Sequence, residues 1–246
     1  ISPGDHVLLH GGSEVRRKFM DAVIAQSDRG YLDALQNYQR ALKQRNALLK
    51  YFAANRTFQA DMLELYDHQL SEYAPVIFAA RSAFAAQFTP MLQEAYEGIS
   101  GGREQVELRY ESLLAEQSMA DLLAERLSKD RVLQFTSAGP HREDLDFTLL
   151  GHPLQRVGSQ GQQKSFLIAL KLAAFEVLHQ ALGRKPILLL DDVFDKLDAQ
   201  RVEGLIRMVN DHRFGQIFVS DTHPERTAEL LKALDQESVV HELTHS

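Results

Sequence analysis

The stretch Ile187-Leu188-Leu189-Leu190-Asp191-Asp192 decides the fold of this chain. Four branched apolar residues run directly into two adjacent carboxylates. A short apolar run that follows Pro186 is typical of a strand buried on both faces in a parallel sheet. Carboxylates at the end of such a strand are costly unless a partner neutralises them, and ligands bind at the carboxyl edge of α/β sheets.

The two acids therefore indicate a Walker-B strand of a nucleoside triphosphatase. Asp191 is then expected to hold Mg²⁺, and Asp192 to position or activate the attacking water. A buried strand followed by an acidic helix cap would produce the same residues. The strand alone leaves both interpretations open.

Composition excludes several classes of protein. The 246 residues are 44% hydrophobic and 25% charged, which is ordinary for one large or two modest globular domains. No apolar run approaches the roughly 20 residues of a membrane helix, and the absence of cysteine excludes disulfides and thiolate metal sites. With no targeting signal at the start, we expect a cytoplasmic protein without a membrane partner.

Charge is segregated along the chain. The net charge is −7, yet residues 13–58 carry nine Lys or Arg against four Asp or Glu. The candidate contacts to DNA phosphates in this basic segment are Arg40, Lys43, Arg45 and Lys50, together with Arg16, Arg17 and Lys18. A solvated helical face is the alternative interpretation.

Hydrophobic spacing predicts a helical arm in the first half of the chain. We expect a short strand at His6–Leu9, then helices over 14–26 and 31–55. A further helical pattern covers 63–92, where Pro75 and Pro90 are expected to kink or interrupt it. The two long helices, joined near Arg56-Thr57, should pack as an antiparallel hairpin.

Strands and helices alternate in the rest of the chain. The expected strands are 105–111, 132–136, 144–150, 154–157, 187–190 and 216–220. The expected helices are 119–127, 160–182, 199–212 and 225–234. Alternation of helix and strand in the C-terminal third implies parallel pairing.

Three further segments carry candidate chemistry. The small residues of Gly158–Lys164 precede a helix, whose free N–H groups suit a phosphate, although Ser159 could equally be a simple N-cap. Asp195–Asp198 follows the Walker-B acids, and Asp198 could be a helix cap. His223, after the next strand, is placed to sense a γ-phosphate, although a lone His is more often structural.

In this order, the motifs resemble the second half of an ABC-type ATPase head, and most closely the RecF family of DNA replication and repair ATPases. The resemblance spans nearly the whole chain. It is carried by Arg16–Asp21, Tyr38–Asn46, Gly139-Pro140-His141-Arg142-Glu143-Asp144-Leu145, Gly158–Lys164 and Leu189–Asp198.

The resemblance implies an α/β ABC-type head with a C-terminal parallel-sheet lobe and an inserted helical arm. Residues 1–12 would form a strand of the head, 13–130 the arm, and 131–246 the lobe with signature, Walker B, D-loop and switch His. It also implies cofactors and partners: ATP with Mg²⁺, DNA junctions or gaps, an ATP-dependent homodimer, and mediators of the RecR and RecO type.

The resemblance assigns roles to individual residues across a dimer. Asp191 would bind Mg²⁺, while Asp192 and His223 would act at the ATP of their own subunit. The residues expected to reach the partner subunit's ATP, or to lie at the dimer seam beside it, are Ser159, Gln160, Gly161, Gln162 and Asp198. The implied function is a weak, DNA-dependent ATPase that helps load recombinase at single-strand gaps.

Two features depart from the common ABC pattern. No Gly is followed by Lys, so the chain contains no Walker-A loop, and we expect that loop upstream. By itself the chain is expected to bind ATP weakly or not at all. Asp192 stands where many ABC ATPases have Glu, which suggests slow turnover. The alternative is a non-hydrolysing SMC-like structural head or a partner-binding module.

Overall fold

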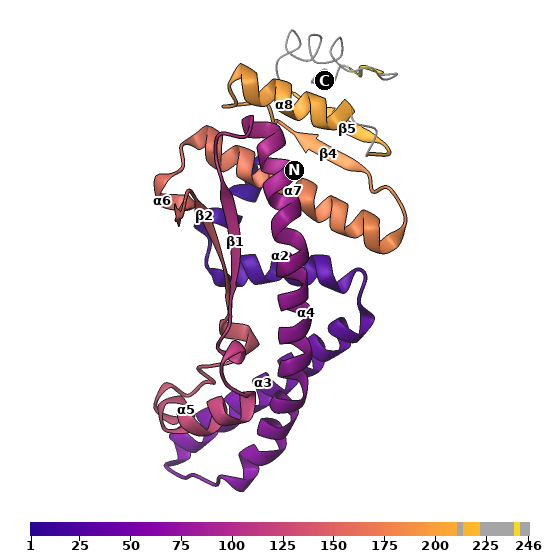
Figure 1. Cartoon of the computed structure of the whole chain (residues 1–246). Helices are drawn as coiled ribbons and strands as arrows, with labels where there is room; N and C mark the ends of the chain where they lie inside the picture. Colours follow the sequence, from indigo (N-terminus) through magenta and orange to yellow (C-terminus); the bar gives the residue numbers. More distant parts are fainter. Residues whose placement is uncertain (211–213, 222–238, 242–246) are drawn as a thin grey trace, which may run out of the picture. The chain divides into compact units, whose positions relative to one another are not determined.

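The computed structural model describes residues 1–210, 214–221 and 239–241 (Figure 1). The chain forms two compact units. Unit 1 comprises Ile1–His6, Met91–Val106 and Leu149–Ser246, and unit 2 comprises Val7–Pro90 and Glu107–Thr148. The division falls within helix α4 and strands β1 and β2. It does not coincide with the expected boundaries after residues 12 and 130. His223 and the helix expected at 225–234 lie outside the described residues.

Unit 2 is mainly helical. Its elements are α1 (Val7–His10), α2 (Ser13–Ala25), α3 (Arg29–Asn55), most of α4 (Asp61–Ser100), η2 (Leu113–Ala115), α5 (Met119–Leu133), η3 (Pro140–Arg142) and the neighbouring strands β1 (Val106–Glu111) and β2 (Asp144–Leu149). Side chains along β1 and β2 alternate between buried and more exposed, as in half-buried strands.

Helices α3 and α4 form the predicted antiparallel hairpin. The Tyr31 hydroxyl lies 3.1 Å from the Arg81 Nε, and the Arg45 Nε lies 2.5 Å from an Asp67 oxygen. Residue numbers thus rise along α3 as they fall along the facing part of α4. Figure 1 shows the two helices side by side with α5.

Pro75 and Pro90 were expected to kink or interrupt the helix. Both lie inside α4, which runs for 40 residues, so neither interrupts it. Each proline removes one backbone donor and strains the preceding turn. Burial on both sides of the prolines compensates, since Ile77, Phe88 and Leu92 are fully buried.

Three short strand predictions are also wrong. His6–Leu9 lies in η1 (Pro3–His6) and α1, where the adjacent Leu8 and Leu9 are both buried, a pattern that an alternating strand cannot produce. Within 132–136, α5 continues to Leu133, and Gln134 then ends it in the left-handed conformation. Residues 154–157 form the helical turn α6 (Leu154–Val157), closed by the Gly158 N–H on the Leu154 carbonyl.

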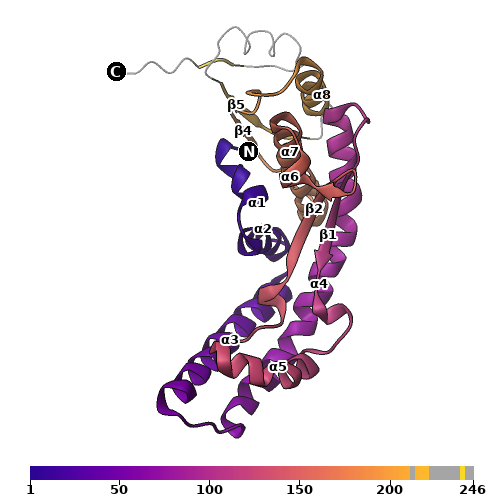
Figure 2. The ribbon, with the colours of Figure 1, turned by 90° about the vertical axis from the view of Figure 1, so that its left-hand side faces the viewer.

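Unit 1 contains the predicted parallel sheet. Its elements are η1, the end of α4, β3 (His152–Pro153), α6, α7 (Gln160–Leu182), β4 (Leu188–Asp191), α8 (Ala199–Asn210) and β5 (Ile217–Ser220). Strands β4 and β5 are parallel, with Leu188 opposite Ile217 and Asp191 opposite Ser220. Figure 2 shows β4 and β5 together, with α7 and α8 in the same unit.

The expectation that β4 is buried on both faces is wrong for the described residues. Leu188 and Leu190 are buried, but Leu189 is 57% exposed and Phe218, its partner on β5, is also 57% exposed. The backbone of Ile1 lies along the edge of β4, where it bonds to Leu189 and Asp191.

Helix α7 is the core helix of unit 1. A capping box begins it at Ser159, and Gly183, with φ of +64°, ends it. Among the described helices, α7 is long and apolar enough to cross a bilayer by length and composition. However, 61% of the relevant window is buried inside the fold, as in the core helix of a globular unit.

Candidate functional site

In unit 1, strand β5 and helix α7 hold the carboxyl end of β4. Asp191 accepts a hydrogen bond of 2.5 Å from the Ser220 hydroxyl, because β4 and β5 place these residues opposite each other. Asp192 adopts a φ of +50°, and its N–H donates to the Ser220 carbonyl at 3.1 Å. Lys164 of α7 donates to the Asp192 carbonyl at 2.8 Å. The turn that carries both acids is therefore fixed by β5 and α7.

The signature segment, residues 158–164, begins α7 with a reciprocal cap. The Ser159 hydroxyl accepts from the Gln162 N–H, and the Gln162 amide oxygen accepts from the Ser159 N–H at 2.8 Å. Ser159 and Gln160 are exposed. The N-cap interpretation is thus confirmed, and the capped turn still presents polar groups to solvent.

The D-loop, residues 195–198, lies against the signature segment. A Cβ on Gly161 would come within 3.3 Å of the Lys196 carbonyl oxygen. Lys196 has a φ of +60°, and the exposed Asp198 caps α8 by accepting from the Arg201 N–H at 2.9 Å. The cap interpretation of Asp198 is therefore also confirmed.

Sequence reasoning missed a carboxylate that links these two segments. Glu104 lies in the turn after α4 and accepts from Gln162 at 2.9 Å and from Arg201 at 2.8 and 3.1 Å. The Tyr96 hydroxyl also donates to it. Burial opposes ionisation, but the hydrogen bonds from Tyr96, Gln162 and Arg201 outweigh it and lower the pKa of Glu104. No local sequence pattern marks this residue.

Asp191 fits the role of a Mg²⁺ ligand. Its side chain is at the exposed edge of the sheet, oriented by Ser220. The described residues contain no group of three or more His, Asp or Glu side chains that could hold a metal alone. Mg²⁺ commonly takes one or two carboxylates and completes its shell with substrate phosphates and water. A single carboxylate here is consistent with that arrangement.

The predicted DNA-contacting residues of α3 divide into two groups. Arg40, Lys43 and Lys50 are exposed and share one face of the helix, and we call them the α3 cation row. Arg45 is fully buried and pairs with Asp67 and Asp130, so its assignment as a phosphate contact is wrong.

The cations of α2 are also partly engaged within unit 2. Arg16 makes a two-pronged ion pair with Asp144 at 2.7 Å, and Arg17 donates to the Glu143 carbonyl at 2.5 Å. Lys18 is exposed and pairs with Glu14 one turn earlier. Arg16 and Arg17 therefore anchor the segment that carries Glu143 and Asp144.

The motif Gly139–Leu145 is a structural junction of unit 2. Glu143 is buried and pairs with Arg81 at 2.6 Å, while the Arg142 guanidinium lies 4.6 Å from the centre of the Phe135 ring. The Thr136 carbonyl can only accept, so His141 donates from Nε2 and its Nδ1 accepts from the Tyr38 hydroxyl at 2.8 Å. Burial lowers the pKa of His141 to about 4.

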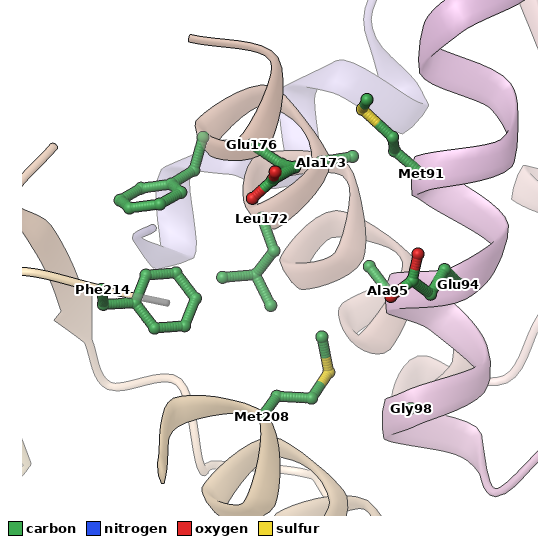
Figure 3. Close-up of a pocket in the computed structure, with 10 residues that line it drawn as sticks. Met91, Glu94, Ala95, Gly98, Leu172, Ala173, Glu176, Met208 and Phe214 are labelled. Carbon is green, nitrogen blue, oxygen red and sulfur yellow. The ribbon is translucent and has the colours of Figure 1, made fainter. Parts of the chain in front are cut away.

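A cavity of about 200 Å³ lies elsewhere in unit 1 (Figure 3). Its apolar lining includes Met91, Leu172, Met208 and Phe214, which come from α4, α7, α8 and the segment after α8. None of the predicted site residues lines it.

Comparison with known proteins identifies the family. No family model matches the chain. The chain is 53% identical over 236 residues to the DNA replication and repair protein RecF of Flavobacterium johnsoniae, and 45% identical over 237 residues to that of Parabacteroides distasonis. Each alignment covers 96% of the chain. The chain belongs to the RecF family. It spans 66% and 64% of the lengths of these two RecF relatives.

Solved structures agree with this assignment. A structure of the recombination mediator protein RecF with ATP, from the RecFOR pathway, matches with a TM-score of 0.79 and 29% identity, covering 92% of this chain and 62% of the other. An Smc head domain from Pyrococcus furiosus matches with a TM-score of 0.52 at 14% identity, covering 96% of this chain and 56% of the other, and supports the fold alone. The fold is that of an ABC-type ATPase head, as the sequence predicts.

Proposed function

We propose that the complete protein is a DNA-binding ABC-type ATPase of recombinational repair and replication. ATP with Mg²⁺ would drive its dimerisation on DNA, and the dimer would help load recombinase at single-strand gaps together with mediators of the RecR and RecO type. The observation that carries the proposal is the joint arrangement of three segments in unit 1. The Walker-B turn, the signature segment and the D-loop contact one another through Lys164 and Gly161.

The chemistry follows from the positions of the carboxylates. Asp191, oriented by Ser220, would take one coordination position of Mg²⁺, which supplies neutralisation of phosphate charge when bound. Asp192, whose backbone is fixed by Ser220 and Lys164, would accept a hydrogen bond from the attacking water and align it. A precisely held carboxylate of this kind acts mainly by positioning.

The signature segment and the D-loop would act on the ATP of the partner subunit. Ser159, Gln160, Gly161 and Gln162 lie at the first turn of α7. The N–H groups of Gln160 and Gly161 lie outside the capping box, and the helix dipole there favours a phosphate. Asp198 is exposed beside them and would lie at the dimer seam. His223 would contact the γ-phosphate of its own subunit's ATP.

DNA binding is proposed for the α3 cation row in unit 2. Three exposed cations on one helical face are suited to backbone phosphates, which dominate sequence-independent affinity. We further propose a cytoplasmic location without a membrane partner.

The test is Asp192→Asn in the complete protein. We expect ATP hydrolysis to fall by about 100-fold or more, while ATP-dependent dimerisation and DNA binding persist, because the neutral amide oxygen holds the attacking water more weakly than a carboxylate and cannot take its proton. The measurements are phosphate release and sedimentation with and without ATP. Unchanged hydrolysis would refute the role of Asp192. Absence of hydrolysis in the parent protein, with dimerisation intact, would favour the non-hydrolysing head.

A further inference from the structure

Glu104 links the signature segment to the D-loop through a continuous set of side-chain contacts in unit 1. Gln162 bridges the two sides, because its amide oxygen accepts from the Ser159 N–H while its amide nitrogen donates to Glu104. Arg201 continues the connection, because its Nη2 donates to both Glu104 oxygens and its own N–H is capped by Asp198.

The linkage is shielded from water and has little freedom to move. The side chains of Glu104 and Arg201 are 16% and 11% exposed, so their attraction is screened less than that of a surface pair. Arg201 is further held by the Ser165 hydroxyl at 3.1 Å and Glu104 by the Tyr96 hydroxyl. With four contacts to hydrogen-bond donors, the Glu104 carboxylate is held in place between the signature segment and the D-loop.

The backbone around Glu104 is built for this close approach. Gly101 has a φ of +75°, which favours glycine, and a Cβ there would lie 2.4 Å from the side-chain amide nitrogen of Gln200, the flexible end of a residue at the start of α8. Further along α8, a Cβ on Gly204 would lie 2.5 Å from the Gly98 carbonyl. The end of α4 and the turn after it are therefore seated directly on α8, the helix that follows the D-loop.

We propose that Glu104 is a positioning residue that fixes the signature segment and the D-loop in one arrangement, so that both engage the partner's ATP together. This inference rests on the proposed function. It predicts a defect in trans: loss of the Glu104 charge impairs hydrolysis of the ATP held by the opposite subunit. ATP binding to the isolated subunit should be unaffected, since Asp191 and Asp192 keep their own contacts.

The test compares Glu104→Gln with the matched control Glu107→Gln in the complete protein. Gln keeps the shape of the side chain but removes the charge that pairs with Arg201. We expect Glu104→Gln to lower kcat by about tenfold, because the signature segment and the D-loop are no longer held in one fixed arrangement at the partner's ATP. The ATP Kd of the monomer should not change. Glu107 is half exposed and pairs with the exposed Arg109, so its variant should behave like the parent.

Recovery of ATP hydrolysis after the two variants are mixed distinguishes a role in trans from a merely structural one, because a folding defect within one subunit would not be complemented. In a mixed dimer of Glu104→Gln and Asp192→Asn, one ATP site carries both defects and the other carries neither. Random exchange of a two-fold dimer should therefore restore about a quarter of the parental rate per subunit. Arg201→Gln should complement Asp192→Asn in the same way, which provides a second variant if Glu104→Gln does not fold.

Failure of the positioning role and failure of the proposed ATPase function give different results. Restored hydrolysis in the mixture supports the trans-acting role. If Asp192→Asn abolishes hydrolysis and neither Glu104→Gln nor Arg201→Gln is complemented, the positioning role is overturned while the proposed ATPase stands. If the parent protein hydrolyses no ATP, the proposed function itself fails.

Discussion

Replacing Arg45 by Met tests whether a buried ion pair, rather than a DNA contact, accounts for this arginine of α3. Arg45 is 0% exposed and contacts Asp130 at 2.7 Å and Asp67 at 2.5 Å, and its Nη1 also donates to Thr136 at 3.0 Å. Asp130 is itself 1% exposed. The variant leaves the Asp130 carboxylate buried with only the two Ser137 donors among its described contacts.

The expected loss of stability depends on whether Asp67 or Asp130 is left buried without a positively charged partner. Asp67 is 32% exposed, so water replaces its partner and its share is about 0–1 kcal/mol. Removing the cation from a buried carboxylate such as Asp130 costs about 3–5 kcal/mol. For a unit of this size, that destabilisation corresponds to a decrease in Tm of about 10–20 °C.

Tyrosine near-ultraviolet circular dichroism provides a selective assay. The chain has no tryptophan, and of its seven tyrosines all but Tyr96 lie in unit 2. Lys43→Met, on the exposed face of the same helix, is the matched control and should change stability by about 0.5 kcal/mol or less.

A second variant separates charge from packing. Arg45→Met combined with Asp130→Asn should regain part of the lost stability, because no unpaired charge remains buried. An Arg45→Met protein that melts within about 2 °C of the parent would refute the reasoning, since breaking a buried ion pair should lower the free energy of unfolding by more than that.

Three further results are expected. Burial lowers the pKa of His141 to about 4, below an unfolded value of about 6.5, so its contribution is fully present above pH 6.5 and falls by about 3 kcal/mol as pH drops through 4. His141→Gln should flatten this part of the pH dependence in urea unfolding, and an identical slope would contradict it. Gly204→Ala should destabilise unit 1 by about 1–3 kcal/mol, because its Cβ meets the Gly98 carbonyl, and hydrogen exchange of α8 amides measures the change. Gly12→Ala, where the new Cβ lies in open space in unit 2, should leave the exchange of the α8 amides unchanged. Neutralising the α3 cation row in the complete protein should reduce the slope of log DNA affinity against log salt by about 2–3, and an unchanged slope would exclude these cations as phosphate contacts.

Arg45 shows how far local spacing can be trusted. Along α3 the buried positions include Tyr38, Leu49 and Phe52, and Arg45 lies on the same helical face. Its position therefore indicated burial, although its charge suggested a surface contact. Asp130 neutralises the buried charge of Arg45. It is 85 residues away in the chain, so helical periodicity cannot identify it.

The sequence by itself determined the strand ending in Asp191-Asp192, the capped helix 160–182 and the parallel pairing that follows. These features depend on local periodicity, capping chemistry and short connections, which act between near neighbours. Short segments such as His6–Leu9 and Leu154–Val157 were mispredicted, because four apolar residues fit a helical turn as well as a strand.

Only the tertiary structure decided which charges are buried and which loops are joined. Glu104 and Arg201 are 97 residues apart in the chain, yet they lie in contact because α4 ends against α8. The same holds for Ser220, whose hydroxyl orients Asp191 only because β4 and β5 pair in that register. Asp191 and Asp192 were thus visible in the sequence as candidate Walker-B acids. The side chains that hold them, and those that link the proposed signature segment to the proposed D-loop, depend on long-range packing.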